Sequence, residues 1–129
     1  MNKIYLAGRY GRRAELAKYA ETLHKMGNKI TASWLDGTHE AHDENPTSFE
    51  KNQWAKEDII DINNSNLFLA FTDNSRGRGG RHFECGYAAG RKIPIYVIGE
   101  TEDNIFYSNY QRFCNFVEFL TDKWDILSY

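Results

Sequence analysis

The sequence feature that most limits the possible folds is an apolar run that leads through a glycine-rich loop into a helix, over residues 66–90. Residues 67–71 (LFLAF) are short and apolar, which is typical of a strand buried on both faces of a sheet. Three glycines and three arginines follow, and a helix is predicted to begin near Arg81. A glycine loop before a helix presents free backbone N–H groups and the positive end of the helix dipole. The segment is therefore predicted to bind an anion.

Glu84 lies close to the predicted start of this helix. We place it in the first turn, where the helix dipole favours the ionised carboxylate by roughly 0.3–1 kcal/mol. An ionised carboxylate beside an anion-binding loop has the chemistry of a nucleophile. The alternative is that Glu84 only stabilises the first turn of the helix.

Predicted strands and helices alternate along the rest of the chain. Ser48 is the expected cap of the second helix, and apolar periodicity marks the helices. Alternation of this kind predicts a single domain over residues 1–129, with an α/β, flavodoxin-like or Rossmann-like fold built on a doubly wound, parallel, five-stranded sheet. The expected strands are 3–7, 29–34, 67–71, 95–98 and an edge strand at 115–120, and the expected helices are 14–26, 48–64, 81–90, 102–110 and 122–127.

Two loops at one edge of this sheet carry most of the arginines. Ligands of open parallel sheets bind outside the carboxyl ends of the strands, and the loops after the first strand and after 67–71 both leave from that edge. Guanidinium groups that converge there are predicted to bind a phosphate, with about half of the six paired instead with carboxylates. The six are Arg9, Arg12, Arg13, Arg76, Arg78 and Arg81.

Composition excludes several classes of protein. The formal net charge of −2 gives no basic field that would attract a nucleic acid polymer or a membrane. Cys85 and Cys114 fit no metal spacing and no disulfide framework. The glycines match neither the dinucleotide fingerprint nor the P-loop, which disfavours dinucleotide binding and NTP hydrolysis. With no signal peptide and no apolar run of transmembrane length, we expect a cytoplasmic protein without a cofactor or a metal.

Taken together, these segments resemble the nucleoside 2-deoxyribosyltransferase superfamily. Three stretches carry the similarity: I-Y-L-A-G with the arginine-glycine turn behind it (4–13), 56–71 and 83–95. The turn at 8–13 is most similar to the 2′-deoxynucleoside 5′-phosphate N-hydrolases, in which that loop helps to hold a 5′-phosphate. G-G-R-H-F-E-C-G and S-W-L (33–35) are similar to a phage and bacterial subgroup of the superfamily.

The resemblance implies three catalytic residues by position. Glu84 matches the nucleophile that attacks the anomeric carbon, Asp58 matches the acid that assists departure of the base, and Tyr5 matches a first-strand tyrosine close to the nucleophile. Two carboxylates in these roles need different pKa values. We expect a low pKa that keeps Glu84 ionised and a raised pKa for Asp58, which lies beside the apolar stripe of its helix. Asp61 is expected to be solvated.

The resemblance also implies a small-molecule nucleoside or nucleotide as the substrate, and a homodimer or higher homo-oligomer in which a neighbouring subunit often completes the site. Arg78 stands where transferases of free nucleosides carry an acid, which favours a phosphorylated substrate. Trp34 and Asp36, at the end of the second strand, could bind a base, although Trp34 also suits the core or a subunit interface. The predicted substrate-binding residues are Gly8, Arg9, Gly11, Arg12, Arg13, Trp34, Asp36, Arg78, Gly79, Gly80, Arg81, Ser108 and Asn109.

The predicted activity is cleavage of the N-glycosidic bond of a (deoxy)nucleoside or its 5′-monophosphate through a glutamyl–sugar intermediate, which passes to water or to another base. Three alternatives stay open: a nucleotide sensor without catalysis, a flavodoxin-like FMN protein, and a hydrolase of an NAD-type nucleotide. His82 is predicted to be a surface histidine. For His39 and His42 in the long loop 35–47, a solvated acidic loop is favoured over a metal site.

Overall fold

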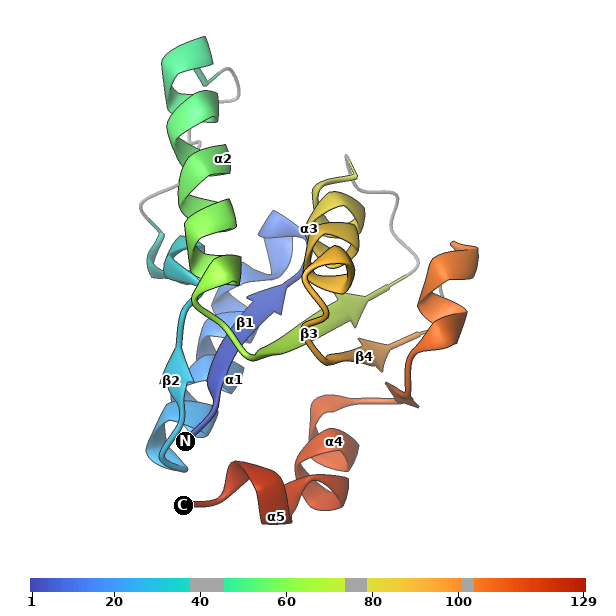
Figure 1. Cartoon of the computed structure of the whole chain (residues 1–129). Helices are drawn as coiled ribbons and strands as arrows, with labels where there is room; N and C mark the ends of the chain where they lie inside the picture. The colour runs from blue at the N-terminus through green and yellow to red at the C-terminus, as the bar shows by residue number, and fades with distance from the viewer. Residues whose placement is uncertain (38–45, 74–78, 101–103) are drawn as a thin grey trace.

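The computed structural model describes residues 1–37, 46–73, 79–100 and 104–129. These residues form a five-stranded, all-parallel sheet in the order β2-β1-β3-β4-β5 (Figure 1). The predicted doubly wound α/β fold is therefore confirmed. The strands are β1 (Lys3–Ala7), β2 (Lys29–Ile30), β3 (Leu67–Thr72), β4 (Ile95–Gly99) and β5 (Arg112–Phe113).

Helices cover both faces of the sheet. In Figure 1, α2 (Ser48–Asn63) and α3 (Gly80–Gly90) lie on one side of β1 and β3, and α1 (Arg13–Lys25) lies on the other. The phenol ring of Tyr19 in α1 stacks at 4.2 Å on Phe116, so α4 (Phe116–Asp122) shares the α1 face. The remaining helical segments are short: the 3₁₀ helices η1 (Tyr10–Arg12), η2 (Ser33–Asp36) and η3 (Ile105–Asn109), and α5 (Trp124–Leu127).

Strand alternation decides which side chains meet each layer of helices. Successive side chains of a strand point to opposite faces, so Tyr5 and Phe68 face α2 and α3, while Phe71 faces α1. The rings confirm this division: Tyr5 stacks on Phe68 at 5.4 Å, and Tyr19 stacks on Phe71 at 5.6 Å. The consequence for function is that Tyr5, although fully buried, points toward α3.

The predicted edge strand at 115–120 is wrong, because this segment forms α4. Asn115 caps the helix by accepting a hydrogen bond from the backbone N–H of Glu118 at 2.9 Å. Phe116 and Phe119, three positions apart, are both buried. This spacing suits one face of a helix, although in the sequence it also resembles an irregular strand-like alternation of apolar and polar residues. The edge strand is β5, which lies just before this helix and has only two residues.

The second predicted strand is shorter than expected. It ends at Ile30, and the chain turns into η2, which closes at Gly37 with a positive φ of 86°. Trp34 is drawn into the core, where its indole N–H donates to the carbonyl oxygen of Leu6 at 2.9 Å. The expectation that Trp34 and Asp36 end a strand is therefore wrong. The buried indole N–H needs a hydrogen-bond acceptor, and the 3₁₀ turn at η2 brings it to a backbone carbonyl of β1.

The cap of α2 also differs from the prediction. Thr47, not Ser48, is the N-cap residue, and its hydroxyl accepts from the backbone N–H of Glu50 at 3.1 Å. The Glu50 carboxylate accepts in return from the N–H of Thr47 at 2.9 Å, which completes a capping box. Moving the cap one residue upstream replaces Lys51 by Glu50 at the third helical position, which is the acid that this motif requires.

Candidate active site

A hydrogen bond between β1 and α3 joins two of the predicted catalytic residues. The hydroxyl of Tyr5 donates to the carboxylate of Glu84, 79 positions further along the chain. Burial, and then the negative charge of Glu84, raise the pKa of Tyr5 well above its ordinary value. The phenol therefore keeps its proton and acts as a donor to the carboxylate.

Glu84 does not lie in the first turn of its helix. α3 begins at Gly80, behind Gly79 with a positive φ of 90°, so Glu84 falls in the second turn. The helix has no acidic residue in its first turn. Because the effect of the helix dipole fades beyond that turn, the placement and the electrostatic role that we predicted from it are both wrong.

The predicted low pKa of Glu84 is wrong as well. Burial of the side chain, together with the negative charge of Asp58, raises its pKa from an ordinary 4.5 to about 8, and the hydrogen bond from Tyr5 opposes this rise. Removal of a carboxylate from water disfavours its charged form, and one phenol hydrogen bond is too weak to reverse that cost. In the free protein the group therefore favours its protonated form at neutral pH.

Asp58 reaches the same place from α2. Its side chain is half-buried, with Oδ1 inaccessible to solvent, and its charge raises the pKa of both Glu84 and Tyr5. One strand and two helices thus bring together a phenol and two carboxylates. Asp61, one turn further along α2, stays partly open to solvent, and its Oδ2 accepts from the N–H and the hydroxyl of the exposed Ser33 at 2.9 and 2.6 Å.

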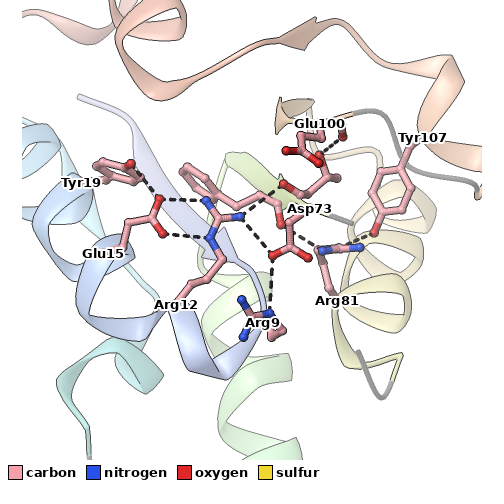
Figure 2. Close-up of polar contacts among 10 residues, drawn as sticks. Arg9, Arg12, Glu15, Tyr19, Asp73, Arg81, Glu100 and Tyr107 are labelled. Carbon is pink, nitrogen blue, oxygen red and sulfur yellow. Dashed lines mark hydrogen bonds and ion pairs between the residues drawn. The ribbon is translucent and has the colours of Figure 1, made fainter. Parts of the chain in front are cut away.

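A second polar cluster lies at the carboxyl ends of β1 and β3 (Figure 2). Asp73, the residue after β3, pairs at 3.5 Å with both Arg9 Nε and Arg12 Nη1. Arg12 also forms two hydrogen bonds with Glu15, at 2.9 and 2.8 Å. Arg81, from the first turn of α3, donates to the carbonyl oxygen of Phe71 at 3.1 Å. The loop after β1 and the start of α3 therefore do meet at the end of β3.

The arginines of this cluster are more fully engaged than the sequence predicted. Arg9 and Arg12 are paired with carboxylates, and Arg13 donates to the carbonyl oxygen of Leu35 at 2.9 Å. Arg81 also donates to the hydroxyl of Tyr107 at 3.2 Å, and its guanidinium lies 5.5 Å from the centre of that ring. We expected about half of the six arginines to be paired with carboxylates. Arg9 and Arg12 are paired in this way, Arg13 and Arg81 bind carbonyl oxygens, and Arg76 and Arg78 lie outside the described ranges.

The glycines of the first loop permit close packing. A Cβ atom on Gly8 would lie 2.8 Å from Leu16 Cδ2, and one on Gly11 would lie 2.5 Å from Arg9 Nη1. Gly11 therefore gives the Arg9 guanidinium room to fold back over the loop. Gly79 and Gly80 have open space around them, and Gly77 is among the residues that are not described.

The other predicted binding residues are scattered. Trp34 is only 6% exposed, so it belongs to the core and does not offer a face to a base. Ser108 is exposed and donates to the carbonyl oxygen of Ile105 at 2.6 Å. Asn109 lines a pocket between α3 and η3 that does not include Glu84. His82, predicted as a surface residue, is exposed but bonds through Nδ1 to the hydroxyl of Tyr107 at 3.0 Å. His39 and His42 lie outside the described residues.

An apolar pocket of about 560 Å³ lies between α3 and η3. It lies on the side of α3 that carries Cys85 and Ala89, and it is lined from η3 by Phe106 and Tyr107. Glu84 is not part of this lining. No three His, Cys, Asp or Glu side chains are grouped to hold a metal ion in the part of the chain that the structure describes, and none of the helices there has the length and apolar character needed to cross a bilayer.

The sequence reasoning missed Asp73. A charged residue directly after a buried parallel strand lies at the ligand-binding edge of the sheet, and that rule alone singles Asp73 out. For Asn104 and Phe106–Tyr107 the sequence predicts a cap over the pocket or a subunit contact, and all three line the apolar pocket. The hydrogen-bond partners of Tyr107 could not be predicted, since Arg81 and His82 are 26 and 25 positions away.

Comparison with known proteins decides the family. The family model described as "Nucleoside 2-deoxyribosyltransferase" matches residues 4–117, a span that contains Tyr5, Asp58 and Glu84. The chain belongs to the nucleoside 2-deoxyribosyltransferase family. It is therefore an enzyme that cleaves or transfers at an N-glycosidic bond, as the sequence predicted.

Solved structures share the fold of this deoxyribosyltransferase-family enzyme. A 2-deoxyribosyltransferase from the psychrotolerant bacterium Bacillus psychrosaccharolyticus is 16% identical, with a TM-score of 0.76 over 98% of this chain and 96% of its own. A CMP N-glycosidase from Clostridium botulinum is 20% identical, with a TM-score of 0.59 over 93% and 96%. A conserved protein from Enterococcus faecalis V583 is 16% identical, with a TM-score of 0.73 over 98% and 99%. Among curated proteins, none matches the sequence.

The raised pKa of Glu84 predicts that this enzyme loses stability as the pH rises. Below pH 4.5 the folded and unfolded chains both hold the proton, and between 4.5 and about 8 the unfolded chain releases it first, so the free energy of unfolding falls. Glu84→Gln removes this dependence. Urea unfolding at pH 8 should show the variant to be more stable than the wild type by at least about 1.4 kcal/mol, the equivalent of one pKa unit.

The comparison needs two controls. At pH 5 the difference between Glu84→Gln and the wild type should shrink. Glu21→Gln, which replaces an exposed acid of α1, should follow the wild type across the range. Equal stabilities of wild type and Glu84→Gln at pH 8 would contradict a buried carboxyl that resists ionisation.

Proposed function

We propose that the enzyme cleaves the N-glycosidic bond of a (deoxy)nucleoside or its 5′-monophosphate by way of a glycosyl ester on Glu84. The observation that carries the proposal is the grouping of Glu84 with a phenol donor, Tyr5, and a second carboxyl, Asp58, on one face of the sheet. A pair of carboxyls is the minimum that retaining glycosidic chemistry requires, one to attack the anomeric carbon and one to protonate the leaving group.

The raised pKa of Glu84 indicates how one proton serves both roles. Near neutral pH Glu84 holds a proton, because burial and then the negative charge of Asp58 raise its pKa to about 8. When that proton moves from Glu84 to Asp58, the net charge of the pair is unchanged. Glu84 becomes the carboxylate nucleophile, with its charge stabilised by the Tyr5 hydroxyl, and Asp58 becomes the acid.

The reaction then proceeds in two steps. Glu84 forms a C–O bond to the anomeric carbon as the C–N bond breaks, and Asp58 gives its proton to the departing base. In the second step Asp58 accepts a proton from water, or from the nitrogen of an incoming base, as that atom attacks the anomeric carbon and releases Glu84. Water makes the enzyme a hydrolase and a base makes it a transferase; the 2-deoxyribosyltransferase and the CMP N-glycosidase with this fold represent both outcomes.

We also propose that the enzyme works in the cytoplasm as a homodimer that packs over the apolar pocket between α3 and η3. Three large side chains at this surface are exposed in the single chain: Phe83 at 66%, Ile105 at 75% and Phe106 at 69%. Aromatic and aliphatic surface of this kind is typical of the core of an interface. Sedimentation equilibrium should give a mass near twice the 15.0 kDa of one chain.

The decisive experiment is incubation with a panel of nucleosides, 2′-deoxynucleosides and their 5′-monophosphates, with and without a second base. Chromatography should show released base together with free sugar or an exchanged nucleoside, or, from a monophosphate, a sugar 5-phosphate or an exchanged nucleotide. Glu84→Gln should lower the rate at least about 10³-fold, since no carboxylate remains to form the ester. Mass spectrometry of quenched wild-type enzyme should find one sugar attached to the peptide that contains Glu84.

Three results would count against this proposal. Tight nucleotide binding with no released base over hours would favour the sensor that the sequence left open, and release of nicotinamide from NAD alone would favour the hydrolase of NAD-type nucleotides. Glu21→Gln is the matched control, because the same change on the opposite face of the sheet should leave the rate unaltered. Retention of the wild-type rate by Glu84→Gln would remove Glu84 as the nucleophile.

Tyr5→Phe tests the shared proton. With one proton required, the rate should fall above about pH 8, where the pair loses it. Loss of the phenol hydrogen bond should raise the pKa of Glu84 further, so the descending limb of kcat/KM against pH should move to higher pH. The plateau should also fall, because the reactive arrangement with an ionised Glu84 becomes rarer.

Tyr87→Phe is the control for the tyrosine variant. Its hydroxyl donates to Asn63 at 2.9 Å, so its removal loosens the contact between α2 and α3 without changing the donor to Glu84. The pH profile of this variant should match the wild type. A descending limb that stays in place in Tyr5→Phe would show that the phenol does not tune the carboxyl.

A further inference from the structure

The carboxylate of Asp73, a residue of the protein itself, lies between the guanidinium groups of the arginine cluster. The Asp73 carboxylate lies 3.5 Å from Arg9 Nε and 3.5 Å from Arg12 Nη1, as Figure 2 shows. The side chains of Asp73 and Arg12 are 20% and 17% exposed, so this pair is partly withdrawn from water. Arg9, at 42%, is the more open of the two cations.

Two carboxylates offset part of the positive charge of the described cluster. Arg9, Arg12 and Arg81 face Asp73 and Glu15, and Glu15 binds Arg12 through both oxygens. A phosphate dianion that approached Arg9 and Arg12 would meet the charge of Asp73 at the same place. Repulsion between partly buried like charges is screened weakly, so the dianion must either displace Asp73 or bind poorly.

The cluster and the carboxyl site share two elements of the fold. Arg9 follows β1, the strand that carries Tyr5, and Arg81 precedes Glu84 by three residues on α3. Three residues of α-helix correspond to about 4.5 Å along the axis. A nucleoside with its anomeric carbon at Glu84 therefore has the cluster within reach of the other end of its sugar.

We propose that Asp73 is a specificity-determining residue, an internal anion that occupies the Arg9–Arg12 pair and makes the enzyme prefer a substrate with a 5′-hydroxyl over one with a 5′-phosphate. The inference rests on the proposed function and narrows it to uncharged nucleosides. It reverses the preference for a phosphorylated substrate that the number of arginines suggested, because the pairing of these groups matters more than their count.

Asp73→Asn keeps the shape of the side chain and removes its charge. The test measures kcat/KM for each 2′-deoxynucleoside and for its 5′-monophosphate. The wild type should favour the nucleoside, and the variant should shift the ratio toward the monophosphate at least about tenfold, equivalent to about 1.4 kcal/mol, chiefly through KM. A ratio that is unchanged, or that shifts toward the nucleoside, would overturn the proposal. So would a wild type that prefers the monophosphate.

Asp125→Asn is the matched control. It removes the same charge from an exposed position on α5, which lies at the opposite end of the sheet (Figure 1). A shift of equal size in this variant would mean that net charge, not the place of Asp73, sets the ratio, and would sink the inference. Asp73→Ser removes the charge with a smaller side chain, so it provides the same comparison if the asparagine variant does not fold.

A binding measurement separates this inference from the proposed chemistry. In a Glu84→Gln background, calorimetric titration with 2′-deoxynucleoside 5′-monophosphates should show at least about tenfold tighter binding when Asp73→Asn is added. Tighter binding in a protein whose wild type releases no base would support Asp73 and reject the glycosidic activity. Base release with no effect of Asp73→Asn on affinity or on the ratio would reject Asp73 and leave the activity standing.

Discussion

The hydrogen bond from Tyr5 to Glu84 is the contact on which the rest of the site depends. It fixes a half-buried carboxyl of α3 against the fully buried Tyr5 of β1, the strand next to the central strand β3. Exclusion of water raises the pKa of Glu84 to about 8, and the nearby charge of Asp58 adds to the rise. In the mechanism that we propose, the same burial that makes the carboxyl costly to ionise makes its charge more reactive when it forms, since fewer water molecules stabilise it.

This arrangement sets stability against function. A glutamine at position 84 would suit the fold at neutral pH better than the acid does, yet it could not form the sugar ester of the mechanism that we propose. Strain of this kind is common where a protein holds a reactive group, and it is offset by packing elsewhere. Here aromatic rings pack on both faces of the sheet. Tyr5 stacks on Phe68 on the face of α2 and α3, and Tyr19 stacks on Phe71 and Phe116 on the face of α1.

The arginine edge illustrates why counts of charged residues are a poor guide to ligand binding. Several guanidinium groups lie at the carboxyl end of the sheet, as the sequence led us to expect, but carboxylates and backbone carbonyl oxygens of the same chain engage them. Asp73 and Glu15 cancel much of the positive charge, and Arg81 is tied to the end of β3 and to Tyr107. Among the described residues, what remains is a wall of guanidinium groups that already have partners, with a reduced net positive charge.

The sequence alone determined the architecture, because hydrophobic periodicity and turn residues are local. Residues 3–7 are β1, the run from Leu67 is β3, and the alternation of strands with helices was enough to predict a parallel five-stranded sheet. Where two local patterns competed, as at 115–120, only packing decided between strand and helix. The partners of Glu84, Asp73 and Trp34 come from segments tens of residues away, and pKa values and ion pairs depend on those distances. The tertiary structure therefore decided which carboxyl resists ionisation and which arginines already have an anion.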